Sequence, residues 1–238
     1  MRYISVYDSR PKGYPASNSA ATEVLEAECG LQASEGWTKW DRGPGDFINL
    51  IQFIESTKSL DRHILEIGTY FGSSAGVLVR YLSYMGIRKT MHLVDVFDGF
   101  IYLEAQLSAD AHWTGTHKTD GVDALRQRLV RSSTQRVMAS GVLIRKINIF
   151  TDEIPDSILK QGLCLATLDV DLYEAVVAGL KKVAPHVVRR GVIVVEDAGH
   201  TPLLSGAPAA LSELLEIPEG REFFAVEMGS GQVALVEV

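Results

Sequence analysis

One stretch, Leu163–His200, constrains the fold more than any other part of this 238-residue chain. It contains two short apolar runs, joined by an amphipathic segment with helical periodicity. Two apolar runs joined in this way are typical of a strand–helix–strand unit with parallel strands. The first run ends at Asp169-Val170-Asp171 and the second at Glu196-Asp197. The stretch therefore predicts two strands that end at one edge of a parallel sheet, where ligands bind in open α/β sheets.

Four carboxylates follow these two predicted strands, and we expect them to converge at that edge. They are Asp169, Asp171, Glu196 and Asp197, and no Lys or Arg stands close to them in the sequence. Crowded carboxylates repel one another unless a cation or a shared proton compensates them. Because every ligand on offer is an oxygen, the pattern favours a hard divalent cation such as Mg²⁺.

The rest of the chain continues the alternation of apolar runs and helical segments. Five further apolar runs predict strands: His63–Ile67, Met91–Val96, Gly141–Ile147, Arg221–Met228 and Gln232–Val238. The last two flank Gly229-Ser230-Gly231, which indicates a β-hairpin. We therefore predict an α/β fold with a doubly wound, mostly parallel, seven-stranded Rossmann-like sheet and a C-terminal antiparallel hairpin.

The segment before the first predicted strand has the pattern of a helical cap. Residues 1–17 look irregular, a first helix is expected to end at Gly30, and a second helix is expected over Phe47–Thr57. We therefore divide the chain into an N-terminal helical cap, residues 1–60, and a sheet domain, residues 61–238.

Charge and cysteine usage narrow the class of partner. The formal net charge is −7, which argues against a nucleic-acid partner held through its phosphates. Cys29 and Cys164 show no metal-binding spacing, which fits a reducing, cytoplasmic compartment. No apolar run reaches the roughly 18 residues that indicate a bilayer span. We expect neither a membrane nor a nucleic acid as partner.

The turn after the first predicted strand carries Glu66-x-Gly68-x-x-x-Gly72. Its glycines allow a tight turn and a close approach of the backbone to a ligand. Glu66 stands where the dinucleotide fingerprint has a glycine, and a carboxylate there repels a pyrophosphate but suits a cationic group. Asp95, at the end of the second strand, is placed to accept hydrogen bonds from a ribose. These features describe S-adenosylmethionine; the alternative is a turn needed only for packing, with Glu66 in solvent.

Two longer blocks resemble known proteins. LEIGTYFGSSAGVL resembles the first motif of class I S-adenosylmethionine-dependent methyltransferases. LDVDLYEAVVAGLKKVAPHVVRRGVIVVEDAGH resembles the macrocin O-methyltransferase family of antibiotic biosynthesis, and its Glu-Asp pair is similar to the related rhamnosyl O-methyltransferase group. The resemblance, from about Ile64 to Asp197, implies a homo-oligomeric O-methyltransferase whose methyltransferase domain is residues 61–238. The implied acceptor is a hydroxyl of a small molecule, either a sugar or another natural-product intermediate.

The same resemblance implies roles for individual residues. It assigns a divalent cation, usually magnesium, to Asp169, Glu196 and Asp197, and a general base to Asp171. Positions expected to bind S-adenosylmethionine are Glu66, Gly68, Thr69, Tyr70, Gly72, Ser73, Asp95, Asn148 and Asp169. The chain departs from the family pattern at Glu196, at Arg190-Gly191 and in the segment after Asp197, which leaves the identity of the acceptor open.

Methyl transfer requires that the acceptor hydroxyl lose its proton while it lies in line with the sulfonium methyl. A bound Mg²⁺ lowers the pKa of a hydroxyl ligand. Asp171 and His200 are the two candidates that can remove the proton. Alternatively, Asp171 caps the following helix, and His200 is a solvated loop residue.

The segment from 97 to 120 is long for a connection between a strand and a helix. Its ring side chains include His112, Trp113 and His117. It either closes over the acceptor, with Trp113 as an apolar wall, or is a surface loop without a catalytic role. Trp37, Trp40 and Tyr14 likewise either line the acceptor pocket or hold the N-terminal cap in place.

Two other classes of function stay open on the sequence alone. One is a binding or regulatory protein that keeps the pocket without turnover, suggested by the altered segment after Asp197. The other is a nicotinamide oxidoreductase on a similar sheet, although Glu66 in place of glycine argues against it.

Overall fold

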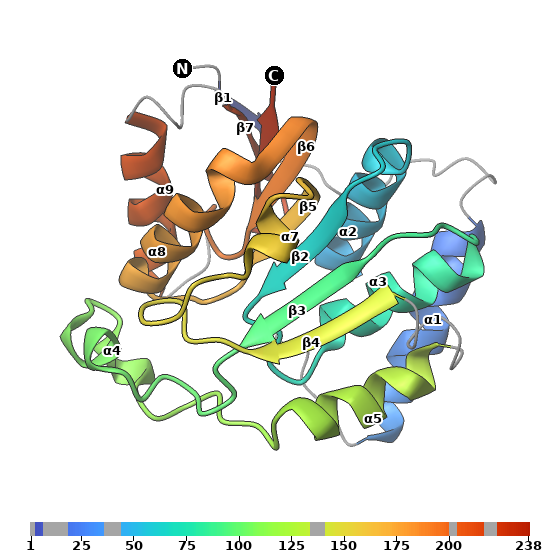
Figure 1. The fold of residues 1–238 in the computed structure, drawn as a ribbon, viewed down its shortest axis with the longest axis horizontal. Coiled ribbons are helices and arrows are strands. Elements are labelled where there is room, and N and C mark those ends of the chain that lie inside the picture. The colour runs from blue at the N-terminus through green and yellow to red at the C-terminus, as the bar shows by residue number, and fades with distance from the viewer. Residues whose placement is uncertain (1–2, 7–18, 36–43, 134–140, 200–203, 217–222) are drawn as a thin grey trace.

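The computed structural model describes residues 3–6, 19–35, 44–133, 141–199, 204–216 and 223–238. Its strands are β1 (Tyr3–Val6), β2 (His63–Ile67), β3 (Met91–Asp95), β4 (Val142–Lys146), β5 (Leu163–Leu168), β6 (Val187–Val195), β7 (Phe223–Met228) and β8 (Val233–Glu237). They form one sheet in the order β1-β7-β8-β6-β5-β2-β3-β4, shown in Figure 1. Strand β8 is antiparallel to both neighbours, and every other pair is parallel. The predicted doubly wound sheet of seven strands with a C-terminal hairpin is therefore confirmed.

The eighth strand is a correction to the prediction. Residues 1–17 were expected to be irregular, but β1 pairs in parallel with β7, with Tyr3 opposite Ala225. Without β1, the outer edge of β7 would present a row of unpaired backbone N–H and C=O groups. Pairing at an edge needs little side-chain pattern, which is why the sequence did not indicate it.

Helices cover both faces of the sheet (Figure 1). They are α1 (Ser19–Ser34), α2 (Pro44–Thr57), α3 (Ser73–Tyr84), α5 (Val122–Ser132), α7 (Asp156–Leu159), α8 (Tyr173–Val183) and α9 (Gly206–Glu216). Helix α1 continues past Gly30, so the expected end there is wrong. A glycine inside a helix costs about 1 kcal/mol, and the buried, hydrogen-bonded side chains of Glu28 and Gln32 hold this part of the helix in place. None of the helices in the described ranges is long and apolar enough to span a bilayer.

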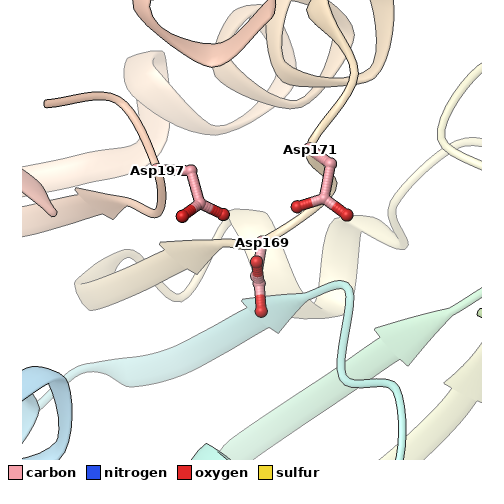
Figure 2. A group of neighbouring side chains, drawn as sticks. All are labelled: Asp169, Asp171 and Asp197. Carbon is pink, nitrogen blue, oxygen red and sulfur yellow. The ribbon is translucent and has the colours of Figure 1, made fainter. Parts of the chain in front are cut away.

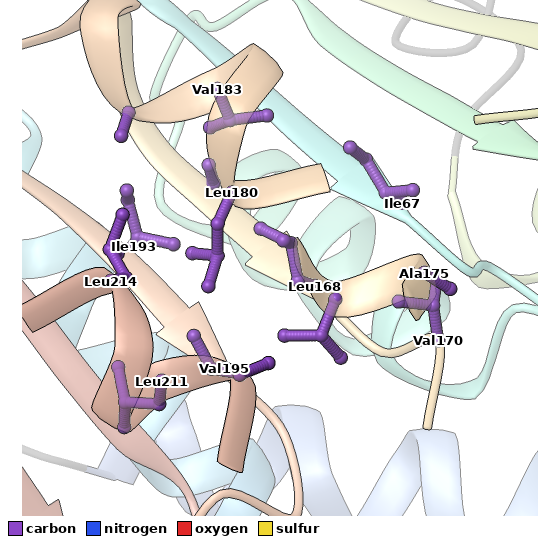
Figure 3. Packing of buried hydrophobic residues seen from close by; sticks show 14 of the residues in the cluster. Ile67, Leu168, Val170, Ala175, Leu180, Val183, Ile193, Val195, Leu211 and Leu214 are labelled. Carbon is purple, nitrogen blue, oxygen red and sulfur yellow. The ribbon is translucent and has the colours of Figure 1, made fainter. Parts of the chain in front are cut away.

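The core has two parts, one on each face of the sheet. Side chains alternate along a strand, so Ile193 and Val195 of β6 face one part while Val192 and Val194 face the other. Figure 3 shows the first part, where α8 and α9 pack on the sheet. Helices α1, α2, α3 and α5 contribute to the second part. Because helices cover both faces, the strand ends are left accessible to a ligand.

Candidate active site

The backbone is strained where four parallel strands end at one edge of the sheet. After β2, β3, β5 and β6 the chain passes through a non-glycine residue with positive φ: Tyr70 (49°), Phe97 (58°), Asp171 (56°) and Asp197 (58°). This left-handed conformation costs about 1–2 kcal/mol per residue. Strain of this kind gathers at functional sites, and here it marks the edge that the sequence predicted.

Gly68 lets the glycine turn, residues 68–72, pass directly against the end of β5. Its φ is +84°, and a Cβ atom there would lie 1.8 Å from the carbonyl oxygen of Asp169. The Gly68 N–H donates to the Val94 carbonyl, and the Asp169 N–H donates to the Ile67 carbonyl, each at 2.9 Å. Gly72, with φ +80°, starts α3. Gly68 therefore serves the close packing of the turn on β5 and Gly72 the turn into α3, while the approach of the backbone to a ligand stays a prediction.

Glu66 lies fully buried beneath the glycine turn. Its carboxylate accepts a hydrogen bond from the Ser74 hydroxyl in the first turn of α3. Thr69 is also buried, and its hydroxyl donates to the Val94 carbonyl at 3.4 Å. The Ser73 carbonyl, at the start of α3, accepts from an amide of α1. The predicted residues are thus in or under the turn, and the alternative of a solvated Glu66 is wrong.

Asp95 connects the glycine turn to the loop after β3. Its Oδ2 accepts from the Tyr70 N–H at 2.7 Å, and its Oδ1 accepts from the Phe97 N–H at 2.6 Å. Burial raises the pKa of Asp95; the two N–H donors oppose this shift, and the nearby Asp169 carboxylate adds to it. A carboxylate oxygen can accept more than one hydrogen bond, so Asp95 can still receive a ligand hydroxyl.

A small cavity lies among the ends of β2, β3, β4 and β5. Four of the predicted donor-binding residues line it: Gly68, Asp95, Asn148 and Asp169. Its volume of about 50 Å³ is far below the roughly 300–1,000 Å³ of a typical ligand pocket. Phe100 and Tyr102, from the loop after β3, close one side. A ligand of nucleoside size therefore requires these two side chains to move.

Tyr102 is a residue of the site that the sequence did not indicate. Its ring centroid lies 4.8 Å from that of Phe150. Burial is the main cause that raises the pKa of its phenol, and the carboxylates of Asp171 and Glu174 add to it. Tyr102 therefore stays protonated between the cavity and the acidic edge. Only the length of the segment from 97 to 120 pointed to this region.

Three carboxylates meet at the edge beside the cavity, as Figure 2 shows. One oxygen from each of Asp169, Asp171 and Asp197 lies within 4.8 Å of the others. All three side chains are partly exposed; Asp169 and Asp171 follow β5, and Asp197 follows β6. Within the part of the chain that the structure describes, this is the one group of at least three acidic, His or Cys side chains at such spacing. An oxygen-only set fits a hard cation such as Mg²⁺.

Glu196 lies outside this group, although the resemblance assigned it to the cation. Glu196 is buried, while Asp197, which has a left-handed φ of 58°, is partly exposed. Gln232 donates an amide hydrogen bond to Glu196 Oε1 at 2.7 Å, and Asn49 donates to Gln232 Oε1 at 2.8 Å. Three of the four acids expected at the edge therefore meet there, and Asp171 takes the place expected for Glu196.

Of the two candidate bases, the structure describes Asp171 but not His200. The N-cap of α8 is Leu172, without a side-chain capping bond, so the alternative that Asp171 caps this helix is wrong. Asp171 instead belongs to the acidic group. His200 lies outside the described residues, as do Trp37, Trp40 and Tyr14.

The segment from 97 to 120 packs against both sides of the site. It contains α4 (Leu103–Leu107) and a 3₁₀ turn (Ala111–Trp113), and Figure 1 shows α4 beyond the carboxyl ends of β3 and β4. The His117 ring lies 5.1 Å from Tyr70 of the glycine turn and 5.7 Å from Trp113. Asp110 accepts a hydrogen bond from the Gly206 N–H at the start of α9 at 2.7 Å. The segment thus connects the glycine turn to α9.

Solved structures with similar folds are methyltransferases. The O-methyltransferase NovP aligns with a TM-score of 0.71 at 13% identity, covering 92% of this chain and all of that chain. The calicheamicin methyltransferase CalS11 aligns with a TM-score of 0.60 at 14% identity, covering 97% of this chain and 94% of that chain. TomG of Streptomyces achromogenes, solved with S-adenosylmethionine, gives 0.54 at 13% identity, covering 92% and 90%. At such identities the likeness shows the fold, which is that of a class I S-adenosylmethionine-dependent methyltransferase.

The family follows from the sequence itself. The model of the macrocin O-methyltransferase family matches residues 47–217. The chain belongs to this family, and it is an S-adenosylmethionine-dependent O-methyltransferase. A search of curated protein sequences found no significant match.

Proposed function

We propose that this enzyme methylates a hydroxyl of a small natural-product intermediate with the help of a divalent cation. One observation carries the proposal: Asp169 both lines the cavity at the strand ends and belongs to the group of three carboxylates. The donor pocket and the acidic edge therefore share a wall. An acceptor oxygen held by the acids would therefore lie next to a methyl group held in the pocket.

The donor is assigned to the ends of β2, β3 and β4. The glycine turn and Ser73 are proposed to hold its amino-acid end, with Glu66 supporting the turn through Ser74. Asp95 would accept a ribose hydroxyl, and Asn148, which lines the same cavity, would contact the adenine. Entry of the donor requires Tyr102 to move, since the cavity is smaller than a nucleoside.

The acceptor is assigned to the acidic edge. Asp169 and Asp197 would hold the cation, and their oxygens and partial exposure suit that purpose. When bound, a divalent cation lowers the pKa of a hydroxyl that it ligates. Asp171, whose carboxylate oxygen lies within 4.8 Å of theirs, is the proposed base that accepts the hydroxyl proton. His200 remains a second candidate.

A sugar is the proposed acceptor class, with other hydroxylated natural-product intermediates as the alternative. CalS11 is described as a TDP-rhamnose 3′-O-methyltransferase of calicheamicin biosynthesis, and its fold is similar to this one. We also propose a homo-oligomer, a cytoplasmic location, and the division into a cap (1–60) and a methyltransferase domain (61–238).

Methyl transfer to a panel of nucleotide sugars and hydroxylated aromatic compounds tests the proposal. Treatment with EDTA should abolish turnover, and added Mg²⁺ should restore it. Asp171→Asn is expected to lower kcat by roughly 10²–10⁴-fold, whereas Asp197→Asn should raise the Mg²⁺ concentration needed for half-maximal rate. Full activity in EDTA would show the cation role to be wrong, and an unchanged kcat in Asp171→Asn would exclude it as the base.

A further inference from the structure

A buried cluster of charged side chains joins α1, α3 and α5. Glu28 of α1 is fully buried. Its carboxylate accepts hydrogen bonds from Arg128 at 2.9 Å, from Arg80 at 3.0 Å and from the Ser132 hydroxyl at 3.0 Å. Removing such charges from water is costly, and a buried ion pair by itself is weak evidence of a role in stability. A role in stability alone is therefore a weak explanation for why these charges are buried.

The cluster continues directly to the glycine turn. Arg128 donates from its second terminal nitrogen to the Gly72 carbonyl at 2.7 Å. The Gln32 amide, which also contacts Glu28 at 3.3 Å, lies 3.3 Å from the Ser73 carbonyl. A Cβ on Gly76 would lie 2.3 Å from a Glu28 oxygen, so the cluster packs tightly against the first turn of α3. The carbonyls of Gly72 and Ser73, at the end of the turn, thus each accept a hydrogen bond from a side chain of the helices α5 and α1.

We infer that Arg128, oriented by Glu28, is a positioning residue for the methyl donor. It fixes the peptide plane that joins Gly72 to Ser73, and so the direction in which the turn and the Ser73 side chain face the amino-acid end of the donor. A turn that is already ordered does not have to be ordered on binding, which favours affinity. The inference rests on the donor site proposed above. It also gives a role to α1, which lies outside the region that the family model matches.

A purely structural role, in which the cluster only attaches α1, makes a different prediction. Arg80 provides the matched control because it contacts the same Glu28 carboxylate, while its other contact is the Arg131 carbonyl at 3.4 Å and not the turn. Replacing either arginine by Met removes one buried charge contact to Glu28. Only the Arg128 change removes the side-chain donor to the Gly72 carbonyl, which keeps its backbone bond from the Gly76 N–H at 2.9 Å; this change also removes the contact to Glu35 at 3.3 Å.

The test compares two ligands by isothermal titration calorimetry. S-adenosylhomocysteine carries the amino-acid end, and 5′-methylthioadenosine lacks it. In Arg128→Met the Kd for S-adenosylhomocysteine should rise about tenfold, while the Kd for methylthioadenosine should stay within about twofold of wild type. In Arg80→Met both values should stay within about twofold. Equal weakening of both ligands in Arg128→Met, or no more weakening than in Arg80→Met, would overturn the inference.

A second variant covers the case in which Arg128→Met does not fold, as judged by its circular dichroism and Tm. Gln32→Met removes the donor to the Ser73 carbonyl and keeps the Arg128–Glu28 pair. It should weaken S-adenosylhomocysteine about threefold without affecting methylthioadenosine, and an unchanged ratio of the two affinities would count against positioning. If the wild type binds neither ligand, the proposed donor site itself fails, and this inference fails with it.

Discussion

Replacing Gly68 by Ala is expected to damage the fold and the donor pocket together. An L-residue at φ +84° costs about 1–2 kcal/mol. The new Cβ would also lie 1.8 Å from the Asp169 carbonyl oxygen, which must move by at least 1.2 Å to reach 3.0 Å. Overpacking of this kind costs about 1–3 kcal/mol. We expect the free energy of unfolding to fall by about 2–5 kcal/mol, which lowers Tm by roughly 5–15 °C.

Gly86 supplies the control for this prediction. Its φ is +64°, but a Cβ there would meet nothing within 4 Å, so Gly86→Ala carries the conformational cost alone. Urea unfolding followed by circular dichroism gives both free energies, and calorimetry gives S-adenosylhomocysteine affinity for the folded variants. Gly68→Ala should be the less stable and should bind the ligand more weakly. If it is no less stable than Gly86→Ala, the close approach of the glycine turn to β5 has been misjudged.

Two further changes test buried polar groups away from the donor. His92, bonded to His63 at 2.9 Å, has its pKa lowered from 6.5 to about 4, mainly by burial. Between pH 6.5 and pH 4 the unfolded chain therefore binds a proton that the folded chain does not. The free energy of unfolding consequently decreases as the pH falls from about 6.5 towards 4. We expect about 2 kcal/mol less at pH 5 than at pH 7.5 in urea titrations, and His92→Gln should flatten this slope; an equal slope in the variant would contradict the assignment. Asp110→Ala removes the acceptor for the Gly206 N–H and should lower the free energy of unfolding by about 1–2 kcal/mol. Asp110→Asn keeps an acceptor oxygen and should therefore retain most of this stability. Equal losses in the two variants would argue against capping.

The sheet could be predicted from the sequence because its signals are local. The strand His63–Ile67 matches its prediction residue for residue, and the predicted crossover within Leu163–His200 is present as β5, α8 and β6. Buried parallel strands are continuous apolar runs, and β2 and β5 are each followed by a helix with a clear apolar face. The edge at which the acids gather follows from this topology alone.

The composition of the acidic group could not be predicted because it depends on backbone angles at single residues. Both Asp171 and Asp197 adopt positive φ, and this rotates their side chains relative to an extended chain. Glu196, one residue before Asp197, has its carboxylate bonded to the Gln232 amide instead. A carboxylate in any of these positions has the same appearance in the sequence. The resemblance to a family assigned Glu196 to the cation, whereas this chain's own geometry directs that carboxylate to Gln232.

The supports beneath the site were invisible for a different reason. A sequence interpretation places acidic side chains on the surface, because they are seldom buried without a partner. Glu28, Glu66, Asp110 and Glu196 are all buried, and for three of them a partner lies far away along the chain, 100 residues apart for Glu28 and Arg128. Glu66 bonds to α3, Asp110 to the start of α9 and Glu196 to Gln232, while Glu28 reaches the glycine turn through Arg128. Local rules fail where a protein gives up stability for function, so these buried acids, rather than the exposed group, mark how far the site extends into the fold.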